Sequence, residues 1–317
     1  MIQSAVTPHE GSVEAVLRSD LAQGDAVLQS AGPIMRHLLS GAQHPIFADE
    51  TVARVRGAVT NVARQLLDAV VAAAGPGDRA ERDPEALDRL VEALIAIPGF
   101  LGHLHALALE WRLIERLRAG QALDPVVPPL LEALLASDDA TTSALAMKLL
   151  AAQARFVQWQ RRMQVPLGEL PADLLHGALL ALRTLGGNDA QVVAAEKSLR
   201  AGYDESRTRL GLIARLLTGM GNGAVAALAL HHAGVAIFAS ALGIASGQDR
   251  DVVVVSTSEG QGTRLGLALR AAGLKQGAIE EQLLAVHAEV ARPVAWDRLA
   301  VEDAGDMLAA ALPHVGA

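Results

Sequence analysis

Residues 252–273 are the part of the chain whose residue types and spacing most suggest chemistry. Four consecutive valines, Val252 to Val255, precede glycines at positions 260, 262 and 266 and an apolar segment. Valine runs favour extended backbone, and a strand that leads into a glycine-bearing turn is the arrangement of a phosphate-binding loop. On this interpretation the protein is an enzyme that holds a phosphate ligand with the Gly260 to Gly266 loop.

Two observations favour a helix over a strand at the valine run. A phosphate-binding strand needs neighbours in a parallel sheet, and no second valine or isoleucine run of that kind occurs in the chain. The glycines follow G-x-G-x-x-x-G, which is neither the dinucleotide motif nor a Walker loop. We therefore predict a helix or irregular turn at 251–258, capped by Ser256, Thr257 or Ser258, and close helix packing at Gly266. The phosphate-ligand enzyme is our third candidate function.

His37 belongs to a second segment with a chemical interpretation. Residues 37–42, HLLSGA, have the outline of the H-x-L-K-G-S phosphoacceptor sequence of histidine phosphotransfer bundles. Ser40 stands where that sequence has lysine, and charge neutralisation is most of what a protein contributes to phosphoryl transfer. A signalling bundle with a phosphoacceptor at His37 is our alternative function. The competing interpretation is a surface or cap histidine.

The other histidines do not have the spacing of a metal site. His103 and His105 are two residues apart, so a helix points them about 200° away from each other, and Glu110 lies roughly two turns from His103. His231 and His232 diverge by about 100°. The chain has no cysteine and neither a G-x-S-x-G nor an H-E-x-x-H motif. We predict no metal, no cofactor and no catalytic residue.

Arginines alternate with aromatic residues in a third segment, RFVQWQRRM at 155–163. Arginine and tryptophan are enriched at binding hot spots. The same letters also suit a structural clamp, in which an arginine stacks on the tryptophan and pairs with Glu169 or Asp173. Both interpretations stay open at this point. The candidate partner-binding residues are Arg155, Trp159, Arg161 and Arg162.

Composition limits the kind of partner. The formal net charge is −8, with acidic and basic residues interspersed, whereas nucleic-acid binders carry a basic excess or stripe. The N-terminus has no basic segment followed by an apolar stretch, so it does not resemble a secretory signal. We expect a cytoplasmic protein that binds an unidentified protein and not nucleic acid, and a homo-oligomer is left open.

One apolar stretch bears on a membrane location. No Asp, Glu, Lys or Arg occurs between residues 216 and 248, and residues 224–245 are numerous enough to span a bilayer. His231 and His232 stand in the middle, Gly234 follows, and the flanks carry no aromatic or basic anchors. We therefore predict a buried helical hairpin, broken near Gly234, and no membrane span.

Helix starts and stops recur throughout the chain, as Asp-Pro starts and glycine stops show. In the predicted helix 188–218, apolar residues mark one face, and Arg209 is among the charged residues expected in water. Polar, glycine-containing segments predict three regions, 1–75, 76–186 and 187–317, although the sequence is also compatible with one continuous domain. The predicted helices are 12–40, 48–74, 84–97, 100–119, 125–136, 139–164, 172–185, 188–218, 223–232, 234–246, 260–272, 277–291 and 302–312.

The chain resembles a known helical family. Residues 130–152 form an apolar helix, an acidic turn and a second apolar helix, as in one HEAT-type repeat. Residues 155–182 and 209–274, with Gly234 to Phe238 and Gly266 to Leu269, resemble domain of unknown function family 2336 of alphaproteobacteria. The resemblance implies an all-helical, HEAT-like fold and transfers no catalytic residue, and in that family the valine positions carry charged residues in a helix.

The predicted fold is therefore all-α, built from stacked antiparallel helix pairs in a HEAT-like solenoid or a multi-helix bundle. From that fold we predict a non-enzymatic protein-interaction or regulatory module. This functional expectation rests on fold analogy.

Overall fold

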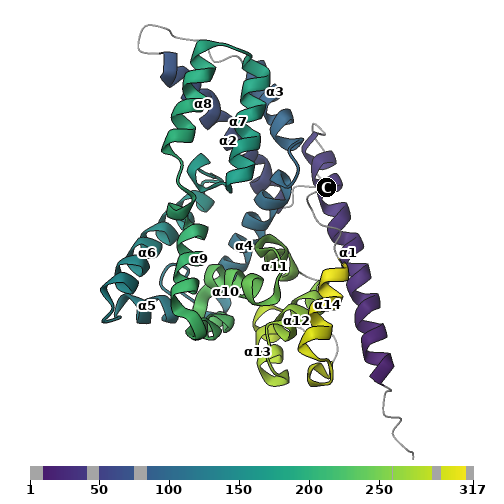
Figure 1. The fold of residues 1–317 in the computed structure, drawn as a ribbon. Helices are drawn as coiled ribbons and strands as arrows, with labels where there is room; N and C mark the ends of the chain where they lie inside the picture. The colour runs from purple at the N-terminus through teal and green to yellow at the C-terminus, as the bar shows by residue number, and fades with distance from the viewer. Residues whose placement is uncertain (1–9, 41–49, 75–83, 259, 288–293, 312–317) are drawn as a thin grey trace, which may run out of the picture.

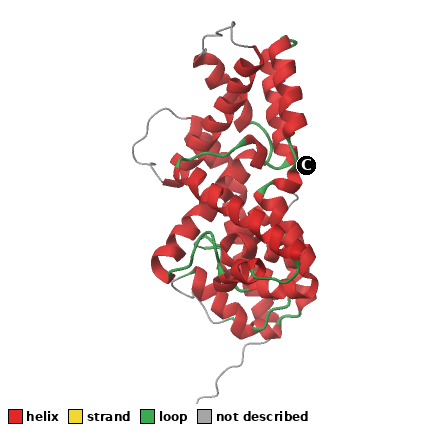
Figure 2. Ribbon diagram, turned by 90° about the vertical axis from the view of Figure 1, so that its left-hand side faces the viewer, coloured by secondary structure: helices red, strands yellow, loops and turns green. Residues whose placement is uncertain are grey.

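The computed structural model describes residues 10–40, 50–74, 84–258, 260–287 and 294–311. Within these ranges the chain is helical and contains no strand, which confirms the all-α class (Figure 2). The elements are α1 (Glu10–Ser40), α2 (Glu50–Ala74), α3 (Pro84–Ile95), α4 (Phe100–Gln121), α5 (Pro129–Leu135), α6 (Ala140–Arg161), η2 (Leu167–Glu169), α7 (Ala172–Gly186), α8 (Ala190–Gly202), η3 (Glu205–Arg207), α9 (Arg209–Met220), η4 (Gly221–Leu228), α10 (Leu230–Ser246), α11 (Arg250–Ser256), α12 (Gly262–Ala271), α13 (Gln276–Val286), η5 (Trp296–Arg298) and α14 (Val301–Ala311).

The helices form groups around α4. In Figure 1, α2, α3, α7 and α8 make up the upper part, α5, α6 and α9 lie at the lower left, and α12, α13 and α14 lie at the lower right beside α1. Helices from the three predicted ranges pack on one another, because α2 contacts α8, α6 contacts α9, and α1 contacts α12 and α14. The pairs α5 with α6 and α7 with α8 follow one another in the chain. The HEAT-like repeat stays a prediction.

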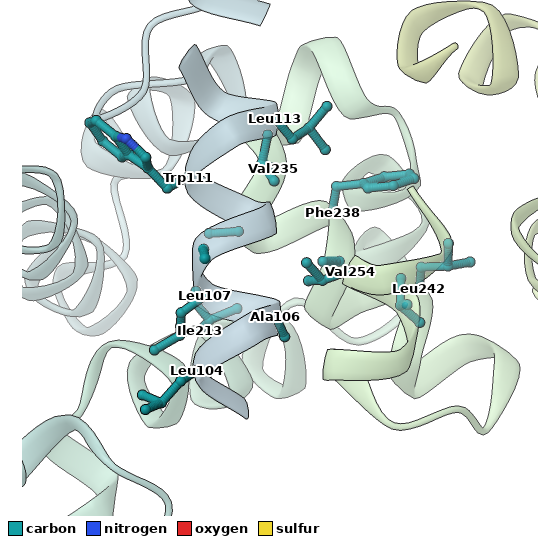
Figure 3. Packing of buried hydrophobic residues seen from close by; sticks show 14 of the residues in the cluster. Leu104, Ala106, Leu107, Trp111, Leu113, Ile213, Val235, Phe238, Leu242 and Val254 are labelled. Carbon is teal, nitrogen blue, oxygen red and sulfur yellow. The ribbon is translucent and has the colours of Figure 1, made fainter. Parts of the chain in front are cut away.

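Helix α4 lies inside the core. Leu104, Leu107 and Trp111 are buried on it, and Figure 3 shows them with Phe238 of α10 and Val254 of α11 around the same helix. A helix that is apolar on most sides is buried on most sides. Any polar residue on the buried sides of α4 therefore needs a partner within the protein.

The valine run is the short helix α11. Asp249 caps its first turn by accepting a hydrogen bond from the Asp251 amide, and Val253 and Val254 are buried. The predicted caps at the other end are wrong: the hydroxyls of Ser256 and Thr257 donate back to the carbonyls of residues 253 and 254. A strand is not formed because the described chain offers no other strand with which to pair.

Gly266 permits a close helix contact, as predicted. A Cβ atom at this position would lie 2.3 Å from the ring of Trp296, which is buried. No side chain larger than hydrogen fits there without a shift of the indole ring. Gly266 is therefore a packing residue within α12 and not part of a loop.

Several predicted helices are shorter in the structure, and two of them show why. Range 188–218 is divided into α8 and α9, because the side chains of Asp204 and Thr208 cap η3 and α9 between them. Range 125–136 begins later, at Pro129, since the Asp124 carboxylate accepts the amides of Val126 and Val127 in a turn. Both corrections come from side chains that compete with the helix for backbone amides.

The apolar stretch 224–245 is broken twice. It passes from η4 into α10 at residue 229, and Gly234 has a φ of 72° inside α10. Residues 233–243 are buried in the core. Within the described residues, one helical segment, Arg209–Leu228, is long and apolar enough to cross a membrane by length and composition, and two bent helix pairs pass the same test together.

Candidate functional site: an arginine and tryptophan surface above a buried ionic network

The candidate partner-binding residues lie at the end of α6. Arg155, Arg161 and Arg162 are exposed, whereas Trp159 is half-buried. The helix stops here because the Gln164 amide returns to the carbonyl of residue 159, after a residue with positive φ at position 163. The loop that follows is fixed to α2, where Asn61 and Gln65 bond to the backbone of residues 165 and 167. The surface is therefore held on two helices.

The positive charges of these arginines are not neutralised by ion pairs within the described residues. Within the described part of the chain, no ion pair involves Arg161 or Arg162, and Arg155 acts on Glu169 only through its electric field. The two cation–π contacts among the described residues involve other arginines, with Arg54 over the Trp111 ring and Arg209 over the Phe156 ring. The stack expected for a clamp on Trp159 is not among them.

A small cavity opens beside Trp159. Its volume is about 20 Å³, and a cavity needs about 10 to 15 Å³ on this measure to hold one water molecule. Apolar side chains form most of its walls, and its polar lining comes from the helices α4, α6, η2 and α9 and from one loop residue. The lining residues are His103, Leu107, Phe156, Trp159, Gln160, Gln164, Val165, Pro166, Glu169, Arg209 and Leu210.

Beneath the cavity, Glu110 of α4 binds two arginines. Its carboxylate accepts hydrogen bonds from both terminal nitrogens of Arg209 at 2.6 and 2.9 Å and from Arg250 at 2.7 Å. Gln153 of α6 also accepts from Arg209, at 3.2 Å. Glu110 and Arg209 are buried, so the expectation that Arg209 lies in water is wrong. Its partner lies 99 positions away, which helix periodicity does not reveal.

The network continues to His103. Arg250 contacts Asp251 at 3.4 Å, and the other oxygen of Asp251 lies 2.7 Å from His103 Nδ1. The ring is 4% exposed, and its Nε2 has no hydrogen-bond partner. His103 is therefore a buried polar residue whose Nδ1 is paired with Asp251, and the residue is also part of the cavity lining.

The network holds its carboxylates ionised. Burial acts to raise the pKa of Glu110, but Arg209 and Arg250 outweigh it and lower that pKa to about 2. Burial also opposes ionisation of Asp251, yet His103 and Arg250 lower the pKa of its carboxyl group. Glu169 differs, because burial raises its pKa despite the backbone amide of Arg209 that it accepts at 2.8 Å.

The other candidate residues lie elsewhere. His37 is within α1, and its side chain is outside the described residues. The loop proposed for phosphate follows a helix and not a strand, with Gly262 as the first residue of α12. His231 is exposed and His232 half-buried near the start of α10. In the described ranges, no three His, Asp or Glu side chains are grouped as metal ligands.

The sequence singled out the exposed arginines and Trp159 as candidates, and it did not indicate the buried ionic network. Glu110, Arg209, Arg250 and Asp251 come from distant segments, and the only available signal was an acidic residue within the apolar α4. No protein-family model, curated protein or solved structure matches the chain. Membership of domain of unknown function family 2336 stays a prediction.

Proposed function

We propose that the protein is a non-enzymatic helical module that binds a protein partner through the surface of Arg155, Trp159, Arg161 and Arg162. One observation carries the proposal: within the described residues, three exposed arginines close in sequence to Trp159 form no ion pair, and the half-buried Trp159 lines a small cavity. Tryptophan and arginine supply a large share of binding energy at interfaces. This surface combines both on a rigid base.

The charge of the surface indicates an acidic partner segment. Guanidinium groups bind carboxylates in paired geometry, and unpaired positive charge speeds encounter with a negative partner. The chain as a whole has a net charge of −8, so this local positive surface would direct such a segment to one place. The indole would provide the apolar centre of the contact.

The test is to identify and measure the partner. Native protein carrying an affinity tag is recovered from its source cells, and the bound protein is then purified and titrated against variants. Trp159→Ala and the double variant Arg161→Glu/Arg162→Glu should each weaken binding at least tenfold, which corresponds to about 1.4 kcal/mol. Arg298→Glu is the matched control, since Arg298 is exposed on η5.

The dependence of the partner's affinity on salt concentration distinguishes specific charge pairing from non-specific apolar association. Binding to the wild type should weaken as the salt concentration rises, and the double variant should lose this dependence. Equal affinity of the partner for the wild type and for both surface variants would refute the proposal.

A further inference from the structure

Met163 brings the end of α6 onto the exposed side of α2. Its φ is 54°, a left-handed conformation that is uncommon for residues other than glycine. A Cβ atom at Gly57 of α2 would lie 3.0 Å from Met163 Cβ and 3.2 Å from its sulfur. The methionine side chain therefore rests on the backbone of α2, and the partner-binding surface at the end of α6 meets a second helix there.

Arg64 lies on the same side of α2 as Gly57. The two residues are seven positions apart, so their directions from the helix axis differ by about 20° and they are separated by about 10 Å along it. Val62 and Leu66 point about 160° away from Arg64, and both are buried in the core. Arg64 itself is exposed, so it lies near the centre of the solvent face of α2.

The charge of Arg64 is not neutralised within the described residues. No ion pair or hydrogen bond involves its guanidinium group there. Arg54 of the same helix differs, because it binds Glu50 at 2.8 Å and donates to the carbonyl oxygen of residue 160. Asp68 follows Arg64 by one turn and is acidic, so the positive surface on α2 ends beyond Arg64.

The loop after Met163 fixes α2 relative to the arginines of α6. Asn61 accepts the amide of residue 165 at 3.0 Å, and Gln65 accepts the amide of residue 167 at 3.1 Å. Arg64 lies between these two anchors in the sequence. Its backbone therefore keeps one position relative to the end of α6.

We propose that Arg64 is a fourth arginine of the partner-binding surface, and that one extended acidic segment contacts both Arg162 at the end of α6 and Arg64 on α2. An extended chain rises about 3.3 Å per residue, so roughly three residues of the segment cover the part of α2 between Gly57 and Arg64. Met163 is 37% exposed and offers apolar contact between the two charges. That the segment belongs to a protein partner rests on the proposed function, whereas the charge of the surface does not.

The surface is tested on the full chain with a fluorescently labelled peptide of ten glutamates, followed by fluorescence anisotropy at low salt. Arg64→Glu and Arg162→Glu should each weaken the affinity about fivefold, the scale of a reversed surface charge. Arg298→Glu on η5 is the matched control and should leave the affinity unchanged. Because Arg64 has no partner within the described residues, the Tm of Arg64→Glu should equal that of the wild type.

Cross-linking tests whether one segment reaches both helices. The double variant Arg64→Lys/Arg162→Lys is treated with a water-soluble carbodiimide, which joins a glutamate carboxylate to a lysine amine as an amide. Mass spectrometry after proteolysis should find single glutamate peptides attached to both new lysines. The chain's own lysines, Lys148, Lys197 and Lys275, are the internal controls and should be attached far less often.

Three results would overturn the inference. They are a wild type that does not bind the glutamate peptide, an Arg64→Glu variant that binds it as the wild type does, and peptides that are never attached to both new lysines.

The outcomes separate this inference from the proposed function. If Arg64→Glu is without effect but Trp159→Ala and Arg161→Glu/Arg162→Glu still lose the partner, the extension onto α2 alone is wrong. If the glutamate peptide bridges the two helices but the partner is indifferent to the surface variants, the proposed function alone is wrong.

Discussion

Replacement of Glu110 by glutamine is the most informative perturbation of the fold. Glutamine keeps the shape of the side chain but removes the charge that Arg209 and Arg250 share. With Glu110 and Asp251 ionised, the two arginines are balanced, and Glu110→Gln leaves one positive charge without compensation in the interior. Loss of one partner from a buried pair costs about 3 to 5 kcal/mol.

The lowered pKa of Glu110 gives a similar estimate for the free energy by which its ionised carboxylate stabilises the fold. The value falls from 4.5 to about 2 on folding, and each difference of one in pKa corresponds to about 1.4 kcal/mol. The ionised carboxylate therefore stabilises the fold by about 3 kcal/mol. Because the folded pKa is lowered, this stability is present above pH 4.5 and is lost as the pH falls from there towards 2.

The assay is thermal unfolding followed by circular dichroism at pH 7 and at several acidic values. About 2 °C per kcal/mol applies to a chain of this size, so the Tm of Glu110→Gln should fall by roughly 6 to 10 °C at pH 7. The gap between variant and wild type should narrow below pH 4. Glu115→Gln is the control on the same helix, where a surface pair with Arg118 contributes at most about 1 kcal/mol.

Two results would contradict this role of Glu110. A Tm for Glu110→Gln within 1 or 2 °C of the wild type, roughly the effect expected of a surface pair, would show that the arginines are not buried on this carboxylate. A gap that stays constant down to pH 2 would contradict the lowered pKa of Glu110.

Four further substitutions test separate positions. Gly266→Ala should cost about 1 to 3 kcal/mol in urea unfolding, because its Cβ meets an indole ring at 2.3 Å. Gly277→Ala, at a helical glycine with open space, should instead be neutral or stabilising by up to about 1 kcal/mol. Thr208→Val removes the cap of α9 and should lower stability by about 1 kcal/mol in the same measurement. Asp25→Asn leaves the buried Arg264 without its anion, so limited proteolysis should cut within α1 faster than in the wild type, and an unchanged pattern would contradict this docking contact.

The helical class was predictable because its signals are local. Caps and glycine stops act within a few residues, as at Asp139, whose carboxylate caps α6 where the acidic turn was expected. The lack of a partner strand also favoured a helix or irregular turn over a strand at the valine run, and the structure has a helix there. The break before α9 was missed because apolar spacing continued through Thr208, whereas the hydroxyl of that residue caps a new helix.

The candidate site was predictable only on its surface. Arg161 and Arg162 are neighbours in the sequence, so their proximity is evident from the sequence alone. Their exposure does not depend on a partner from a distant segment. The burial of Arg209 depends on Glu110 and Gln153, which follow from tertiary packing and not from periodicity. The pairing of His103 Nδ1 likewise depends on an aspartate 148 positions away.

The ion pairs of Glu110 with Arg209 and Arg250 also restrict the order in which the chain can fold. During synthesis α4 is complete long before α9 and α11 exist, so its acidic residue has to stay hydrated or protonated until both arginines arrive. Contacts over 99 and 140 positions make this a late and slow event. A fragment that ends at residue 186 would therefore lack the groups that allow α4 to be buried, and separate expression of the halves should yield soluble protein only when both are present together.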